Sequence, residues 1–133
     1  MDKNVKKELF EKAKAARENA YVPYSEFPLG AALLTSDGKI FTGCNIEIAN
    51  YGLTNCAERT AIFKAVSEGF KDFEAIIVVS GTDKPVTPCG SCRQVISEFG
   101  DNIEVIMMNL EGEEINSNIK ELLPGAFKQE DIE

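Results

Sequence analysis

The sequence predicts an α/β protein built on one mixed β-sheet that helices cover on both faces. Two apolar runs, 74–80 and 103–109, are continuous rather than alternating, which is typical of strands buried on both faces. The Asp37-Gly38 pair is a strong hairpin signal and predicts that one pair of strands is antiparallel. Because helical segments alternate with the buried strands, the simplest arrangement is a single sheet of about five strands between helices.

The first elements along the chain are a helix and a β-hairpin. Residues 4–20 place apolar side chains three and four positions apart among Lys and Glu, which predicts an amphipathic helix. Two prolines mark a loop over 22–28, and strands are expected over 29–36 and 39–45, on either side of the Asp-Gly turn. A polar loop over 46–54 follows the hairpin.

The rest of the chain alternates helix and buried strand. Thr54 or Asn55 can cap a helix that runs to about Ser67. The first buried strand comes next, then a loop with two prolines, a helix over 90–99 and the second buried strand. The expected elements of the tail are a short strand at 111–113 and a short helix stopped by Pro124.

Length, composition and charge exclude several classes of protein. The 133 residues fit one domain, 1–133, with 44% apolar and 27% charged residues and no repeat or linker. A net charge of −8 disfavours a nucleic-acid polymer as partner, because such binding depends on neutralising phosphates. The chain has no histidine, so a general acid or base has to be Asp, Glu, Lys, Tyr, Cys or water.

The amino-terminal segment, MDKNVKKELFEKAKAARENA, lacks the apolar core of a secretory signal. No window of about 18 residues is apolar enough to span a membrane. Four cysteines without an export signal are expected as thiols or metal ligands rather than as disulfides. We therefore expect a cytoplasmic protein with no membrane partner.

Three of the cysteines are placed to bind a metal. Cys89 and Cys92 form a C-x-x-C motif after Pro88, at the start of a predicted helix, and Cys56 lies at the start of another helix. Free N–H groups and the helix dipole stabilise thiolates at such positions. Three thiolates converging there can hold one zinc ion per chain and leave its fourth position open, as in catalytic sites.

Glu58 follows Cys56 by two residues, which places its carboxylate close to such a metal without requiring it to bind. A ligand followed by x-E and later by P-C-x-x-C is the arrangement of zinc deaminases, in which the glutamate is the acid/base. Here the two halves are C-A-E at 56–58 and P-C-G-S-C at 88–92. Glu58 is therefore the candidate catalytic residue.

Beyond these motifs, the chain resembles the short, single-domain cytidine deaminases almost from end to end. The stretches that carry the resemblance are 21–47, 51–66, 88–95 and 121–127. The resemblance implies a three-layer α/β/α sandwich and a homotetramer. It also implies hydrolytic deamination of cytidine and 2′-deoxycytidine to uridine and 2′-deoxyuridine, with release of ammonia, in pyrimidine salvage.

The resemblance also implies which residues contact a nucleoside substrate. Asn45 and Glu47 match a pair that bonds the sugar hydroxyls, and Phe27 matches an aromatic that packs on the base. Ala57 matches a position whose backbone N–H meets the base carbonyl, and Phe127 matches an aromatic that reaches a neighbouring subunit's site.

Arg59 matches an arginine beside the zinc sulfurs, and charge explains why one is needed there. Zinc with three thiolates carries a charge of about −1, which raises the pKa of bound water; a cation and two helix N-termini offset this. One departure from the family pattern is Ile48, where Asn or Ser is expected, and it falls in the loop after Glu47.

Several of these residues have simpler interpretations. The C-x-x-C could be a redox pair, although that leaves Glu58 unexplained. Cys44 could complete a four-cysteine structural zinc site, but alternation puts it on the opposite face of an extended segment from Asn45. Solvation could explain Glu58, core packing could explain Phe27 and Phe127, and bonding within a loop could explain Asn45.

Three other functions remain open at this point. A deaminase of polynucleotides is disfavoured by the negative charge and by Cys56, where such relatives usually have histidine. A non-enzymatic zinc module would not need Glu58. A deaminase of a nucleoside-like antibiotic shares the metal motifs, but Glu47 favours an ordinary ribose. The sequence does not rank cytidine against deoxycytidine.

Overall fold

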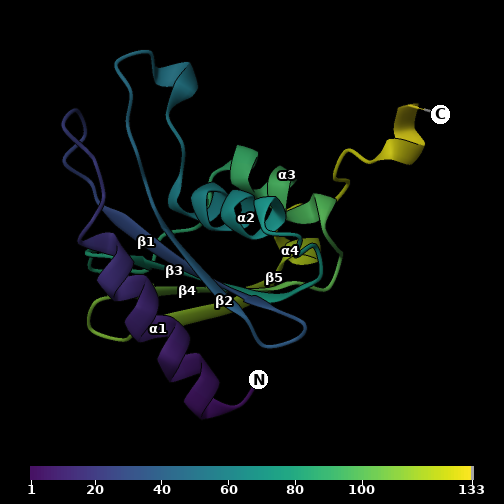
Figure 1. Ribbon diagram of the computed structural model, residues 1–133, viewed down its shortest axis with the longest axis horizontal. Coiled ribbons are helices and arrows are strands. Elements are labelled where there is room, and N and C mark those ends of the chain that lie inside the picture. Colours follow the sequence, from purple (N-terminus) through teal and green to yellow (C-terminus); the bar gives the residue numbers. More distant parts are fainter. Residues whose placement is uncertain (133) are drawn as a thin grey trace.

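The hairpin and the two buried runs form one five-stranded sheet in the computed structural model, which describes residues 1–132 (Figure 1). The strands are β1 (Leu29–Thr35), β2 (Ile40–Cys44), β3 (Phe73–Ser80), β4 (Glu104–Asn109) and β5 (Glu114–Asn118). The α-helices are α1 (Lys3–Arg17), α2 (Ala57–Ser67), α3 (Gly90–Glu98) and α4 (Ile119–Leu122), and the 3-10 helices are η1 (Tyr51–Leu53) and η2 (Gln129–Ile132).

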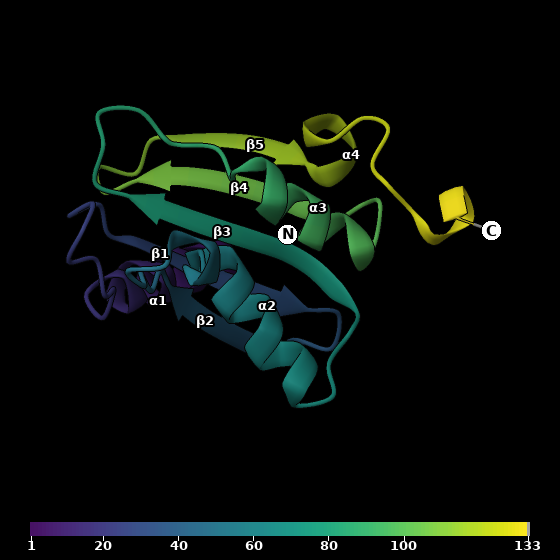
Figure 2. The ribbon, with the colours of Figure 1, turned by 90° about the horizontal axis from the view of Figure 1, so that it is seen from above.

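The strand order in the sheet is β2-β1-β3-β4-β5. The continuous apolar runs, β3 and β4, lie inside the sheet and are parallel, and every other pair is antiparallel. Parallel neighbours need a long crossover, which α3 and its flanking loops supply (Figure 2). The prediction of one mixed sheet of about five strands is confirmed.

Helices cover both faces of this sheet. On one face, Leu9 and Ala13 of α1 pack on a buried cluster that includes Ile77 and Val79 of β3. On the other face, α2, α3 and α4 bury a second cluster (Figure 1). The three-layer α/β/α arrangement is therefore confirmed. None of the helices in residues 1–132 is both long and apolar enough to cross a bilayer.

The register of the sheet gathers the connecting loops at one end. Gly30 pairs with Cys44, the last residue of β2, and Leu29 pairs with Ser80, the last residue of β3. The chain therefore leaves β2 toward α2, and leaves β3 toward α3, beside the point where the loop 22–28 enters β1. Residues from all three connections can meet at this end.

The structure differs from the predicted elements at three boundaries. Helix α1 ends at Arg17 rather than at residue 20, because Tyr21 bridges to Ile46 and the chain has to turn before it. Helix α2 begins after Cys56, since Asn55 still pairs with Ile46. The predicted strand at 111–113 is wrong: Gly112, with φ of 89°, turns the chain there, and β5 starts at residue 114.

Candidate active site

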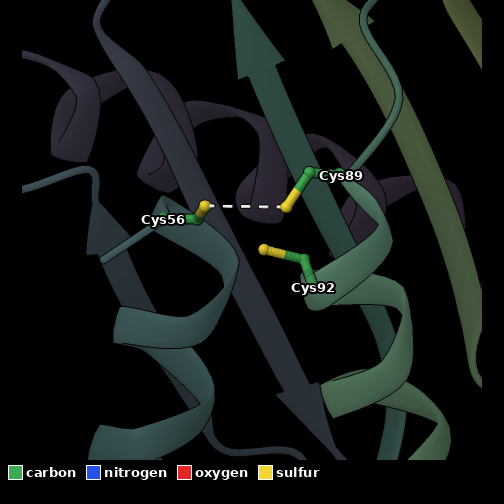
Figure 3. A group of neighbouring side chains, drawn as sticks. All are labelled: Cys56, Cys89 and Cys92. Atoms are coloured by element: carbon green, nitrogen blue, oxygen red, sulfur yellow. Dashed lines mark hydrogen bonds between the residues drawn. The ribbon is translucent and has the colours of Figure 1, made fainter. Parts of the chain in front are cut away.

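The three predicted metal ligands lie together at the starts of α2 and α3. Cys56 and Cys89 are the N-cap residues of the two helices, and Cys92 is in the first turn of α3. Their Sγ atoms all lie within 4.8 Å of one another, with 3.9 Å between Cys56 and Cys89. Figure 3 shows the three side chains pointing toward one another.

This donor set fits zinc. A tetrahedral ion with Zn–S bonds of about 2.3 Å holds its sulfurs about 3.8 Å apart, close to the Cys56–Cys89 separation of 3.9 Å. Neither of these two cysteines uses its side chain to cap its helix, so both sulfurs are available to a metal. Three protein ligands leave one position of a tetrahedral ion for water or substrate.

Cys44, the alternative fourth ligand, does not belong to this group of thiols. It is the last residue of β2 and is half-buried, and burial raises the pKa of its thiol. Within residues 1–132, the arrangement therefore supports a three-cysteine centre rather than a four-cysteine structural site.

Electrostatics at the helix starts favour thiolate at Cys56. A hydrogen bond with Cys92 lowers the pKa of Cys56 to about 5, and Arg59 adds to the effect. The interaction with Cys56, together with burial, raises the pKa of Cys92. The positive end of the helix dipole also stabilises a thiolate at an N-cap.

Glu58 lies in the first turn of α2 and is 3% exposed. Its Oε1 is buried and has no hydrogen-bond partner among the described residues. The pKa of this carboxyl is raised to about 7, mainly by burial and in part by the negative charge of the Cys56 thiolate. A carboxyl with this environment is suited to accepting and returning a proton near neutral pH.

Arg59 reaches the sulfur cluster from the same helical turn. Its Nη2 donates a hydrogen bond of 3.2 Å to the Sγ of Cys56, and the neighbouring thiolate raises the pKa of the guanidinium. The guanidinium therefore stays charged beside the Cys56 sulfur, where a positive charge can offset part of the negative charge of thiolates.

Three residues that the sequence analysis did not include in the site fix the start of α2. A Cβ atom on Gly43 of β2 would lie 2.5 Å from the carbonyl oxygen of Ala57, so only glycine allows this approach of strand and helix. Thr60 Oγ1 donates to the carbonyl of Cys56 (3.1 Å) and accepts from Asn55 Nδ2 (3.0 Å). No sequence signal indicates this role for Gly43, whereas Asn55 and Thr60 lie close to the C-A-E motif at 56–58.

Arg93 fixes the start of α3 in a similar way. Its Nε donates to the carbonyl of Pro88 (2.8 Å), directly before Cys89, and its Nη1 donates to the carbonyl of Leu122 (2.9 Å) at the end of α4. Arg93 is the residue after the C-x-x-C motif, and that proximity is the one signal that could have indicated its role.

The three residues expected to contact the sugar and the base lie together at the entrance to β1. Asn45 bonds the backbone on both sides of Pro28, donating to the carbonyl of Phe27 (2.8 Å) and accepting from the N–H of Leu29 (2.9 Å). Glu47 is buried, and its pKa is lowered by hydrogen bonds from Ser25 and from the backbone N–H of Tyr24. Phe27 is 40% exposed.

The remaining predicted residues are placed as follows. Ala57 is fully buried at the first position of α2, between Cys56 and Glu58. Phe127 is exposed on the segment after α4, and its backbone N–H and carbonyl are both bonded to the side chain of Gln94 on α3. The side chain of Ile48 is exposed, and its backbone N–H donates to Thr54 Oγ1 across the loop.

Fold and site together fit one class of protein: a zinc hydrolase, in which a buried glutamate lies beside three cysteines that can hold the metal. Comparison with known proteins narrows this class. Residues 3–108 match the family described as the cytidine and deoxycytidylate deaminase zinc-binding region. The chain belongs to the cytidine and deoxycytidylate deaminase family, which confirms the resemblance inferred from its motifs.

Individual relatives are similar over nearly their whole length. A cytidine deaminase of Sporosarcina psychrophila is 56% identical over 125 residues, which cover 93% of this chain and 92% of the relative. One from Halalkalibacterium halodurans is also 56% identical, over 93% of this chain and 95% of the relative. The crystal structure of cytidine deaminase from Burkholderia pseudomallei superposes with a TM-score of 0.89 at 52% identity, covering 96% of this chain and 100% of that one.

Proposed function

We propose that this chain is a zinc-dependent cytidine deaminase that converts cytidine and 2′-deoxycytidine to uridine and 2′-deoxyuridine with release of ammonia. The observation that carries the proposal is the buried Glu58 carboxyl. Its Oε1 has no hydrogen-bond partner within residues 1–132, and Glu58 lies in the first turn of the helix whose N-cap is Cys56. A buried polar atom without a partner is costly, and a proton-donating substrate or water would satisfy it. The relatives named cytidine deaminase support the choice of substrate.

The chemistry divides between the metal and Glu58. A zinc ion held by Cys56, Cys89 and Cys92 would supply a water molecule of lowered pKa. Glu58 accepts one proton from the water that attacks C4 of the pyrimidine and delivers it to N3. It then accepts the second proton from the hydroxyl at C4 and delivers it to the departing amine, so that ammonia leaves and a 4-keto group remains. Arg59 offsets the charge of the thiolates, which would otherwise oppose loss of the water proton.

The sugar and the base meet different parts of the site. Glu47 Oε2 accepts one hydrogen bond, from Ser25, and Asn45 uses one of its two amide N–H bonds, so both keep capacity for a sugar hydroxyl. The exposed Phe27 ring packs on the base. Ala57 donates to the base carbonyl, because the N–H of a first helical residue has no acceptor within its helix.

The enzyme acts in the cytoplasm, in pyrimidine salvage, as a homotetramer in which Phe127 reaches a neighbouring site. Large apolar side chains are exposed on the loops and the tail, including Tyr51 at 72% and Phe127 at 59%. The segment after α4 also leads away from the sheet in both views (Figures 1 and 2). A reducing compartment suits a centre that depends on three thiols.

The test is ammonia release from cytidine, 2′-deoxycytidine and free cytosine by protein whose zinc content per chain is known. Both nucleosides are expected to react. Cytosine is expected to be a very poor substrate, because Asn45 and Glu47 would be left without a sugar partner. No ammonia from either nucleoside at one zinc per chain would contradict the function, and equal turnover of cytosine and cytidine would contradict the sugar contacts.

A further inference from the structure

The loop 22–28, which carries Phe27 into β1, has a backbone that few side chains adopt. Glu26 has a φ of 57°, in the left-handed region that disfavours residues other than glycine. The cost of such a conformation has to be offset by surrounding contacts. The contacts on either side of Glu26 therefore determine where the Phe27 ring lies.

Ser25 supplies the contact on one side. Its hydroxyl donates to Glu47 Oε2 and accepts a hydrogen bond of 3.1 Å from the backbone N–H of Phe27. Glu47 Oε1 accepts from the backbone N–H groups of Tyr24 and Ser25, each at 3.0 Å. A single hydroxyl thus joins the carboxylate of Glu47 to the backbone of Phe27.

Asn45 completes the arrangement on the other side. Its amide donates to the carbonyl of Phe27 at 2.8 Å. Both backbone polar groups of Phe27 are therefore bonded to side chains, one of Ser25 and one of Asn45, and the partly exposed ring is left to face a ligand.

We propose that Ser25 is a positioning residue for nucleoside binding. Its hydroxyl holds the Glu47 carboxylate, which contacts the sugar, at a fixed distance from the Phe27 ring, which contacts the base. This inference rests on the proposed function. Ser25 does not touch the reacting atoms. It acts by ordering Glu47 and Phe27 before the substrate arrives, so that the free energy of binding is not reduced by the entropy lost in ordering them.

The expected effect falls on substrate binding. Alanine at position 25 removes the donor to Glu47 and the acceptor for the N–H of Phe27, so the KM for cytidine should rise about 10-fold. The three cysteines and Glu58 lie at the starts of α2 and α3, away from Ser25 in the chain, so kcat and zinc content should change little.

The experiment compares Ser25→Ala and Ser25→Thr with the wild type on cytidine and on 2′,3′-dideoxycytidine. Thr keeps a hydroxyl, and position 25 is exposed. Ser36→Ala is the matched control, because Ser36 is also exposed and its hydroxyl makes no hydrogen bond within residues 1–132. Zinc content and thermal unfolding of each variant show whether it is folded.

We expect Ser25→Ala to raise the KM for cytidine more than the KM for the dideoxy analogue. Ser25→Thr should have a KM close to that of the wild type, and Ser36→Ala should match the wild type. Equal losses on both substrates, a loss confined to kcat, or a Thr variant that behaves like Ala would overturn it. Wild-type protein that fails to deaminate cytidine would instead overturn the proposed function, and the role of Ser25 with it.

Discussion

Replacing Gly43 by alanine should displace the catalytic helix. The added Cβ would lie 2.5 Å from the carbonyl oxygen of Ala57 and 2.6 Å from the nitrogen of Ala61. Both are backbone atoms of α2, so no change of rotamer relieves the overlap. A carbon–oxygen contact needs about 3.3 Å, which requires α2 and β2 to separate by about 0.8 Å.

That displacement carries Cys56 and Glu58 with it, since they flank Ala57. A misplacement of about 1 Å can cost roughly 10²-fold in rate, and overpacking typically costs about 1–3 kcal/mol of stability. We therefore expect Gly43→Ala to lower kcat for cytidine by about 10²-fold and to lower the thermal unfolding temperature.

The assay is kcat for ammonia release, with zinc per chain and thermal unfolding measured on the same preparations. Gly52→Ala is the matched control, because its Cβ would meet its nearest neighbour, Asn50 Oδ1, at an ordinary 3.4 Å. Wild-type kcat and stability in Gly43→Ala would refute the idea that the contact between β2 and α2 sets the position of the catalytic residues.

Two further predictions concern the metal and the assembly. Replacing any one of the three ligand cysteines by alanine should abolish activity and reduce zinc content, whereas Cys44→Ala should keep both; loss of zinc from a folded Cys44→Ala variant would revive the four-cysteine site. Sedimentation at assay concentration should give a tetramer, and Phe127→Ala should weaken cytidine binding; a fully active monomer would remove Phe127 from the site.

The metal centre was predictable from sequence because its signals are local. Cys56 and Cys89 each come directly before a helical pattern, and both are N-cap residues in the structure. The continuous run of β3 predicted a buried central strand for an equally local reason. The order of helices and strands then constrained the layers of the fold.

Contacts between distant segments were not predictable in this way. Ser25 and Glu47 are far apart in sequence and meet because Tyr21 pairs with Ile46. Gly43 is required by helix α2, which begins well after it in the chain. The strand expected at 111–113 is misplaced because Gly112 takes the positive φ of a turn.

The central claim is that Glu58 moves protons beside a zinc centre that three cysteines hold without its help. Glu58→Gln tests this most directly, because glutamine keeps the shape of the side chain and cannot accept the proton. With one zinc per chain in both proteins, kcat for cytidine should fall by about 10²–10⁴-fold or more. A Glu58→Gln protein with full zinc content and near-normal kcat would contradict the account.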